Sequence, residues 1–453
     1  DGNLEWADIP VDSPELYKKY LPHPSQFDAQ FYETVLRAWS TLVCADKLDA
    51  ATVQPPADTS RPDIERFRTN LAELPEGESP LETELNRLRT AAHEDCYTTL
   101  QQAYVAGNRL FTLTLPTGFG KTLTGLRACL ELAEQEDSRV IYALPYTSVL
   151  DQVDSVCREF LDADPLSGAY TIHHHLADTR TTLNERADSD APSTGTEALF
   201  AETWQSGLVL TTFTQLFESA AGPRNTQSMK LPALQDSIIL LDEPQGLPLD
   251  WWNLVGRLVQ SLIDEYNATV IAMTATQPQI FEQTPDLPSP TSLTDSAEAC
   301  RAFLRDHPRV EFVLHDSVTN HLTGENPETV SLDAAALELV QATDAHSNTL
   351  AVVNTVRSAA TLTETIARTV PESRSALYLA EGLQQFYQEH SDAQESDTTR
   401  ADAYLDFLAQ RATVNGTTTL IAALTTRIRP RDRRLLLAAL RRILDDETST
   451  PFD

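Results

Sequence analysis

The sequence predicts an α/β protein whose parallel β-sheet is covered by helices on both faces. From about Leu81 to Thr276, short apolar runs alternate with segments of helical periodicity, which is typical of parallel sheets. A loop with two glycines follows one run and two adjacent carboxylates follow another, as expected where parallel strands end beside a ligand. The runs interpreted as buried strands are Leu110–Leu115, Val140–Leu144, Leu208–Leu210, Ile238–Leu241 and Val270–Met273.

The segment before this core is predicted to be helical and to end in a linker. Residues 31–50 place these apolar side chains on one helical face: Phe31, Val35, Leu36, Trp39, Leu42 and Val43. A stretch rich in Pro, Thr and Asp near residues 51–63 is typical of a linker. Within the core, residues 178–196 contain almost no apolar side chains and are expected to form an exposed loop.

A second α/β unit is predicted from about Arg309 onward. Its helices are expected after Val356 and through Arg431–Leu444. An acidic, Gln-rich segment near residues 384–400 is expected to be exposed. The strands of this unit are placed at Val310–Leu314, Leu350–Val353 and Leu420–Leu424.

Length and cysteine usage narrow the class of protein. The 453 residues suffice for two or three domains, and no apolar run reaches the roughly 18 residues that a membrane span needs. The five cysteines form no CxxC pair, which indicates reduced structural thiols. Since the first residues also lack the basic and apolar stretches of a signal peptide, we expect a cytoplasmic protein.

The charge balance is strongly acidic, with a formal net charge of −33. Lysine is rare, and the acidic residues are spread along the whole chain. Two interpretations are open: a protein that avoids nucleic acid, or a halophilic protein whose acidic surface keeps it hydrated in strong salt. The even spread favours the halophilic interpretation, under which a nucleic-acid groove need only be locally basic or neutral.

Residues Leu113–Thr122, LTLPTGFGKT, have the pattern of a phosphate-binding loop between a strand and a helix. Two glycines let the backbone curl around phosphate oxygens, and the helix start adds its positive dipole end. Lys121 supplies a cation for the β- and γ-phosphates and Thr122 a hydroxyl for Mg²⁺, so ATP with Mg²⁺ is the expected ligand. Leu115 departs from the pattern, which usually begins with Gly or Ala. The predicted nucleotide-binding residues are Pro116, Thr117, Gly118, Phe119, Gly120, Lys121 and Thr122.

Two later segments complete the expected chemistry. Asp242 and Glu243 follow the strand Ile238–Leu241, where Asp242 is expected to hold Mg²⁺ and Glu243 to orient the attacking water. After the strand Val270–Met273, Thr274 and Thr276 are expected to hydrogen-bond to this acidic pair and to couple hydrolysis to another domain. An acidic turn and a simple capping role are the alternatives for these segments.

In order and spacing, LPTGFGKT, DEPQ and TAT resemble the motor core of superfamily 2 helicases. Other segments resemble the helicase motifs of the type I CRISPR-associated helicase-nuclease. They are ALPYTSVLDQV at Ala143–Val153, TTFTQLFESA at Thr211–Ala220, SIILLDEPQGLP at Ser237–Pro248, MTATQP at Met273–Pro278, VVNTVRSA at Val352–Ala359 and LTTRIRPRDR at Leu424–Arg433. Gln245, which completes the catalytic set, stands where many members of that family have His.

The resemblance implies two RecA-like domains preceded by an HD-type metal nuclease domain. The expected division is a nuclease remnant over residues 1–55, a linker over 56–80, a first RecA-like domain over 81–300 and a partial second one over 301–453. Asp46 stands where the last metal-ligand Asp of the nuclease would lie. His23 is interpreted as a loop residue, and the cluster His173–His175 as a loop or domain-packing feature rather than a metal site.

The resemblance also implies an ATP-driven motor that moves along single-stranded DNA and feeds an HD nuclease, which needs a divalent metal, together with a CRISPR surveillance complex of the Cascade type. Predicted DNA contacts are Pro145, Tyr146, Thr211, Thr212, Thr355 and Arg427. The late motifs with arginine fingers are not found, so we expect a fragment that binds ATP but turns it over slowly. Another superfamily 2 helicase, on RNA or DNA, and a non-catalytic scaffold with a motor fold are the alternatives.

Overall fold

The computed structural model divides into two compact units, Asp1–Arg309 (unit 1) and Val310–Asp453 (unit 2). It describes residues 29–52, 61–74, 77–161, 169–173, 199, 201–222, 224–276, 280–284, 287–294, 296–308, 331–342, 348–371, 374–390, 397–411, 417–425 and 427–445. In these ranges no helix is long and apolar enough to cross a membrane.

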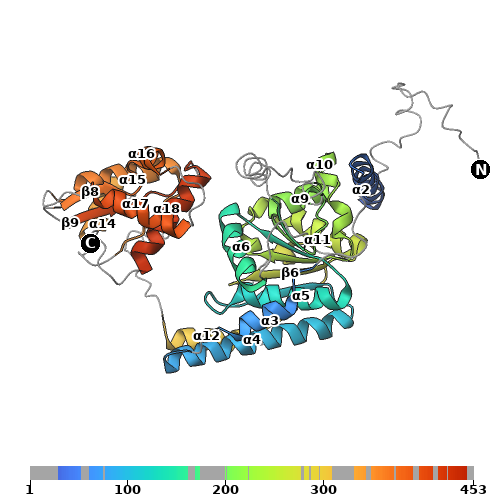
Figure 1. Cartoon of the computed structure of the whole chain (residues 1–453). Coiled ribbons are helices and arrows are strands. Elements are labelled where there is room, and N and C mark those ends of the chain that lie inside the picture. Colours follow the sequence, from blue (N-terminus) through green and yellow to red (C-terminus); the bar gives the residue numbers. More distant parts are fainter. Residues whose placement is uncertain are drawn as a thin grey trace, which may run out of the picture. The chain divides into compact units, whose positions relative to one another are not determined.

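Unit 1 is built on the parallel sheet that Figure 1 shows between layers of helices. Within the described ranges this sheet has seven strands, in the order β3-β4-β2-β5-β6-β1-β7. The strands are β1 Leu110–Thr114, β2 Val140–Leu144, β3 Tyr170–His173, β4 Leu208–Thr212, β5 Ile238–Asp242, β6 Thr269–Thr274 and β7 Thr291–Ser292. Every pairing is parallel. The predicted α/β class and all five predicted strands of this unit are confirmed.

Side chains of the central strands alternate between two apolar layers, because successive residues of a strand point to opposite faces. Val140, Tyr142 and Leu144 of β2 belong to one core, while Ile141 and Ala143 belong to the other. Both faces are buried, so the strands are continuous apolar runs rather than alternating ones.

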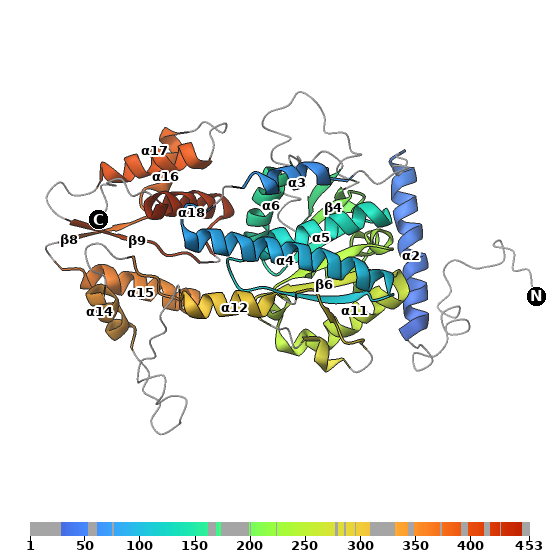
Figure 2. The same cartoon turned by 90° about the horizontal axis from the view of Figure 1, so that it is seen from below.

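Helices cover both faces of this sheet (Figures 1 and 2). One layer consists of α3 Ile64–Ala72, α4 Pro80–Val105, α5 Lys121–Glu136, α6 Thr147–Leu161 and α12 Ala297–Asp306. The other contains α2 Ala29–Ala50, α9 Phe213–Ala221 and α11 Trp252–Tyr266. The short helices of unit 1 are α10 Asn225–Ser228, η3 Leu231–Leu234, η4 Pro244–Gly246, η5 Leu249–Trp251 and η6 Ile280–Gln283.

Local sequence sets where α4 and α5 begin and end. Ser79 and Glu82 form a reciprocal capping box at the start of α4, with Pro80 at its first position. Gly120 caps α5 in the left-handed conformation, and Asp137 adopts that conformation at its end. The phosphate-loop helix is therefore fixed at both ends by residues next to it in the chain.

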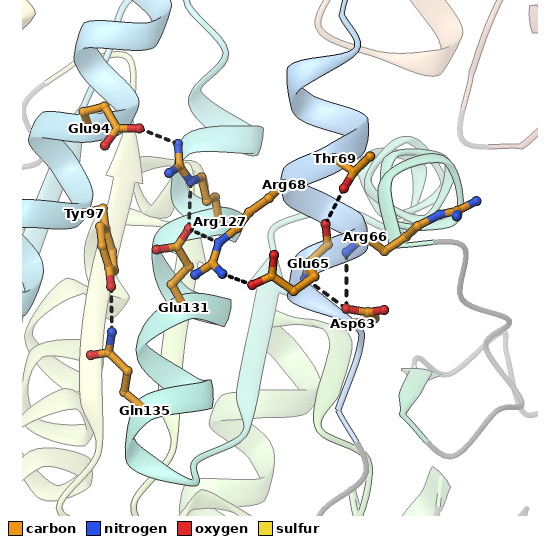
Figure 3. A network of polar contacts seen from close by, with 10 residues as sticks. All are labelled: Asp63, Glu65, Arg66, Arg68, Thr69, Glu94, Tyr97, Arg127, Glu131 and Gln135. Atoms are coloured by element: carbon orange, nitrogen blue, oxygen red, sulfur yellow. Dashed lines mark hydrogen bonds and ion pairs between the residues drawn. The ribbon is translucent and has the colours of Figure 1, made fainter.

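A buried ion network joins α3 and α4 to α5 (Figure 3). The Glu131 carboxylate, whose side chain is 2% exposed, accepts hydrogen bonds from Arg127 Nε at 2.9 Å and Arg68 Nε at 3.2 Å. Arg127 also donates to Glu94 of α4 at 3.0 Å. The linker prediction for residues 56–80 is wrong where α3 lies, because the apolar side of this short helix, with Phe67 fully buried, packs into the core.

Unit 2 contains two parallel strands in its described residues, β8 Arg374–Tyr378 and β9 Thr417–Ile421. Its helices are α14 Leu332–Ala342, α15 Val356–Thr369, α16 Leu383–Glu389, α17 Asp397–Ala409 and α18 Pro430–Asp445. A separate core includes Phe386, Tyr404 and Leu408. The predicted helices after Val356 and over Arg431–Leu444 correspond to α15 and α18.

Several strand predictions for unit 2 and the sheet edges need correction. Residues Leu350–Val353 form no strand, and Leu350 and Val352 are each 87% exposed. The predicted strand Val310–Leu314 lies outside the described residues, as does the predicted loop over 178–196. Strands β3, β7 and β8 have few consecutive apolar residues, so apolar runs did not reveal them. The predicted exposed segment 384–400 contains Phe386, which is buried within α16.

Candidate functional site

The phosphate loop connects the end of β1 to the start of α5. Gly118 and Gly120 have φ angles of 89° and 75°, which suit glycine because it lacks a Cβ. The Phe119 N–H donates to the Pro116 carbonyl at 3.2 Å and closes a tight turn. Leu115, the departure from the usual motif, is fully buried, and its N–H continues the β1–β6 ladder by donating to the Thr274 carbonyl at 3.2 Å.

Helix α4 supports the loop with two residues that the sequence analysis did not single out. Arg89 donates from Nε and Nη2 to the Gly118 carbonyl, at 3.0 and 2.6 Å. His93 is buried beside Gly120, where a Cβ would lie 3.4 Å from its Nε2. Burial, aided by the charges of Arg127 and Arg89, lowers the pKa of His93 to about 4, which keeps the ring neutral at physiological pH. Nothing in the local sequence pattern signals these contacts.

Lys121 lies against the acidic pair. Its Nζ is 3.4 Å from Asp242 Oδ1 and forms an ion pair with Glu243 Oε1. Burial lowers the pKa of Lys121, and Asp242 opposes that shift. Burial also raises the pKa of Asp242 despite the opposing effects of Lys121 and Tyr142. Lys121 thus contacts both predicted carboxylates, although 121 positions of the sequence separate it from Asp242.

Tyr142 is a further residue that the sequence analysis missed. It is fully buried on β2, and its hydroxyl donates to Asp242 Oδ2 at 3.0 Å. A tyrosine in an otherwise aliphatic buried strand was the available signal, since a buried hydroxyl needs a partner.

Glu243 is the centre of the coupling contacts. It has a φ of 53°, its N–H donates to the Met273 carbonyl at 2.8 Å, and its Oε2 accepts from Thr274 Oγ1 at 3.3 Å. Gln245 Nε2 donates to the same carboxylate. The Thr276 N–H donates to Thr274 Oγ1 at 3.1 Å, while its own side chain is exposed. The strand ends of β5 and β6 therefore bring together four of the predicted residues, three of them by side chain.

Comparison with known proteins agrees with this arrangement. Residues 85–279 match the family model described as "Type III restriction enzyme, res subunit". Over 464 aligned residues the chain is 33% identical to the CRISPR-associated nuclease/helicase Cas3 of Haloferax volcanii, which covers 90% of this chain and 48% of that protein. The chain is therefore a homologue of part of this relative. It spans about half the length of this curated relative.

The solved structures that resemble this chain do so only weakly. T. fusca Cas3 with ATP is 15% identical, with a TM-score of 0.41 over 91% of this chain and 48% of that one. The DUF1998 helicase MrfA bound to DNA is 15% identical, with a TM-score of 0.39 over 88% of this chain and 56% of that one. Likeness at this level supports no conclusion about function.

The predicted DNA contacts of unit 1 differ in accessibility. Tyr146 is 59% exposed after β2, and Pro145 lies against Gly246, where a Cβ would be 3.3 Å from it. Thr211 is fully buried and donates to the His173 carbonyl at 2.8 Å, and Thr212 is 4% exposed and caps α9. These two hydroxyls therefore have structural partners, which disfavours the prediction that they hold DNA.

The predicted contacts of unit 2 lie near one cavity. Thr355 caps α15 by accepting from the Ser358 N–H at 2.9 Å. Next to it, Val356 lines a cavity of about 490 Å³ at the carboxyl ends of β8 and β9, together with Arg427 and Thr425. Arg427 is exposed, so its guanidinium is accessible to a phosphate.

The metal-site predictions remain predictions. Asp46 is exposed on α2, and the described residues contain no cluster of three or more potential ligands. His23, His174 and His175 lie outside the described residues. His173 ends β3, is buried, and packs edge-on against Trp204 with ring centroids 6.0 Å apart, which agrees with a packing role for this residue.

The residues around Asp242 fit Mg²⁺. Its Oδ1 is buried and, apart from the ion pair with Lys121 Nζ at 3.4 Å, has no hydrogen-bond partner within the described part of the chain. A hard cation with oxygen ligands would satisfy that atom, and the Thr122 hydroxyl at the start of α5 is a second oxygen of the kind that such a cation takes. Thr122 and Asp242 are thus the residues that would hold the ion.

Proposed function

We propose that the chain is an ATP-driven motor that moves along single-stranded DNA. The observation that carries the proposal is the meeting of Lys121, Asp242 and Glu243 at the carboxyl ends of parallel strands, beside a glycine-containing loop. Ligands of parallel α/β sheets bind at this edge. Homology to a nuclease/helicase over 90% of the chain supports the same conclusion.

The ion pairs suggest how nucleotide binding changes the site. In the structure, Lys121 forms an ion pair with Glu243. A β- or γ-phosphate would draw Lys121 away, because it carries more negative charge than one carboxylate, and Glu243 would be free to accept a hydrogen bond from the attacking water. Mg²⁺ held by Thr122 and Asp242 would neutralise charge on the phosphates.

The side chains of Thr274 and Gln245 would move when the partners of the Glu243 carboxylate change. Both side chains donate to the same carboxylate oxygen, so a change in its partners alters their positions. Thr274 is also tied to the backbone of Thr276 in the following loop. This path links hydrolysis to segments outside the nucleotide site.

The name of the homologue supports a proposal for the role of the intact protein in the cell. We place residues 1–55 with an HD-type nuclease domain that takes a divalent metal, 81–300 and 301–453 with two RecA-like domains, and the protein in the cytoplasm of a halophilic cell. Its DNA strand would come from a CRISPR surveillance complex of the Cascade type. Homology to a CRISPR-associated protein disfavours an unrelated RNA helicase, and the intact set of Lys121, Asp242 and Glu243 disfavours a scaffold.

Nucleotide binding and single-turnover hydrolysis test the proposal. Lys121→Ala should weaken the binding of a fluorescent ATP analogue with Mg²⁺ by at least about tenfold, since a charge-assisted contact contributes about 1.5–3 kcal/mol. Lys47→Ala, which changes an exposed lysine on α2, is the control. Glu243→Gln should bind but not hydrolyse.

Stimulation by nucleic acid separates the rival functions. Hydrolysis in single turnover should rise with poly(dT) and not with poly(U). Equal stimulation by RNA would favour another helicase, and binding of ATP unchanged by Lys121→Ala would rule out the proposed site.

A further inference from the structure

We propose that Tyr142 is a positioning residue for Mg²⁺, because its hydroxyl holds the carboxylate of Asp242, one of the two side chains that would bind the ion. The inference rests on the proposed ATP-driven function and deepens it. It assigns to the buried face of β2 a part in the metal site that no motif of the sequence indicates.

The first step is the bond between neighbouring strands. Tyr142 of β2 and Asp242 of β5 lie on adjacent parallel strands, and Tyr142 Oη donates to Asp242 Oδ2 at 3.0 Å. Tyr142 is fully buried and Asp242 is 4% exposed, so water does not compete for this bond. With Oδ2 engaged, the carboxylate cannot rotate freely. Its Oδ1 forms the ion pair with Lys121 Nζ at 3.4 Å and accepts no other hydrogen bond from a described residue.

The second step concerns the direction of this bond. A tyrosine hydroxyl has one proton, and Tyr142 gives it to the carboxylate, which only accepts. The bond therefore favours the charged form of Asp242, which is the form that binds a cation.

The bond therefore orients the Asp242 carboxylate at the end of β5, beside Lys121 at the start of α5. Residues that orient metal ligands typically contribute about 10- to 100-fold to metal affinity. Removing only the Tyr142 hydroxyl should therefore weaken Mg²⁺ and leave the phosphate loop itself intact.

The test is Tyr142→Phe, measured by Mg²⁺ titration of the binding of a fluorescent ATP analogue. The Mg²⁺ concentration at half-saturation should rise about 10- to 100-fold. Binding of the corresponding ADP analogue in EDTA should stay within about twofold of wild type. Half-saturation is a property of the folded molecules alone, so a smaller folded fraction does not change it.

Tyr170→Phe is the matched control. Tyr170 is also fully buried, on β3 of the same sheet, and donates to an aspartate, Asp154 Oδ1, at 2.7 Å. The structure assigns it no contact with Thr122 or Asp242. Its replacement should alter stability but not the Mg²⁺ half-saturation.

The outcomes are distinct. An unchanged Mg²⁺ half-saturation in Tyr142→Phe, or an equal change in Tyr170→Phe, would overturn the positioning role while leaving ATP binding in place. A loss of EDTA-resistant ADP binding would also overturn it, since Tyr142 would then support the whole loop. If the wild type itself binds ATP without any effect of Mg²⁺, the proposed metal site fails first.

Discussion

Replacing Glu131 with Gln should lower the free energy of unfolding of unit 1 by about 2–4 kcal/mol. Glu131 receives one charge-assisted hydrogen bond from Arg127 and one from Arg68, each worth about 1.5–3 kcal/mol. Glutamine retains one neutral acceptor worth about 1 kcal/mol. Arg68 has a 36% exposed side chain and regains water readily, so the loss lies in the lower part of the resulting range.

The chain offers a matched control in Glu298→Gln. Glu298 also pairs with two arginines, Arg301 at 3.1 Å and Arg305 at 2.9 Å, but its side chain is 64% exposed. At 1 M KCl the Debye length is about 3 Å, so exposed pairs are screened while the buried carboxylate of Glu131 is not. Glu298→Gln should leave stability unchanged within error.

Urea unfolding in molar KCl, followed by tryptophan fluorescence, measures both variants. Glu131→Gln should shift the transition to lower urea with an unchanged slope. Equal stability of the two variants would refute the argument that burial, rather than the number of partners, gives this ion network its strength. A shift for Glu131→Gln that disappears in high salt would refute it as well.

The dependence of the free energy of unfolding on pH, measured at acid pH, provides a second test for Glu131. Burial by itself raises the pKa of Glu131, but the hydrogen bonds and charges of Arg68 and Arg127 outweigh it and lower the pKa overall. Stability from a depressed carboxyl pKa is complete above the ordinary value of about 4.3 and is lost as pH falls through the folded value. Glu131→Gln should therefore flatten the curve below about pH 4.3.

Two further predictions concern His93 of α4 and the exposed side chain of Trp251. Because the pKa of His93 is lowered to about 4, the free energy of unfolding of unit 1 should fall by about 3 kcal/mol as pH falls from about 6.5 to 4. His93→Gln should remove this loss. A variant that keeps the same dependence of stability on pH would exclude His93 as its source. Trp251 is 54% exposed a few residues after the acidic motif Asp242–Gln245, where a base could stack on it. Trp251→Ala should therefore weaken the binding of a labelled dT oligonucleotide, measured by fluorescence anisotropy, by about 1–3 kcal/mol. Trp39→Ala, at a 44% exposed tryptophan on α2, should have no effect, and equal losses would argue against stacking at Trp251.

The sequence alone was sufficient for the core strands and for the strand–loop–helix geometry around Gly118 and Gly120. A strand buried on both faces must be continuously apolar, so Val140–Leu144 and Ile238–Leu241 were visible as such. Gly118 and Gly120 mark positive φ angles, and a lysine and a threonine at the helix start follow from phosphate chemistry. These features depend on neighbours within a few positions.

Short or edge elements were not visible from sequence. Strand β7 has two residues and β3 has four, and helix α3 lies in a segment whose prolines and threonines indicate a linker. Their stability comes from packing against the rest of the sheet and its helices. Phe67 of α3, for example, packs against Phe160 of α6 with ring centroids 5.6 Å apart.

Only the tertiary structure decided what each functional side chain contacts. It showed that Tyr142 bonds to Asp242, that Arg89 holds the Gly118 carbonyl, and that Thr211 is buried rather than available to DNA. A parallel sheet orders its strands differently in space than in the chain, so residues 100 positions apart become neighbours. Local pattern specifies which residues end a strand, whereas hydrogen-bond partners and burial follow from that strand order.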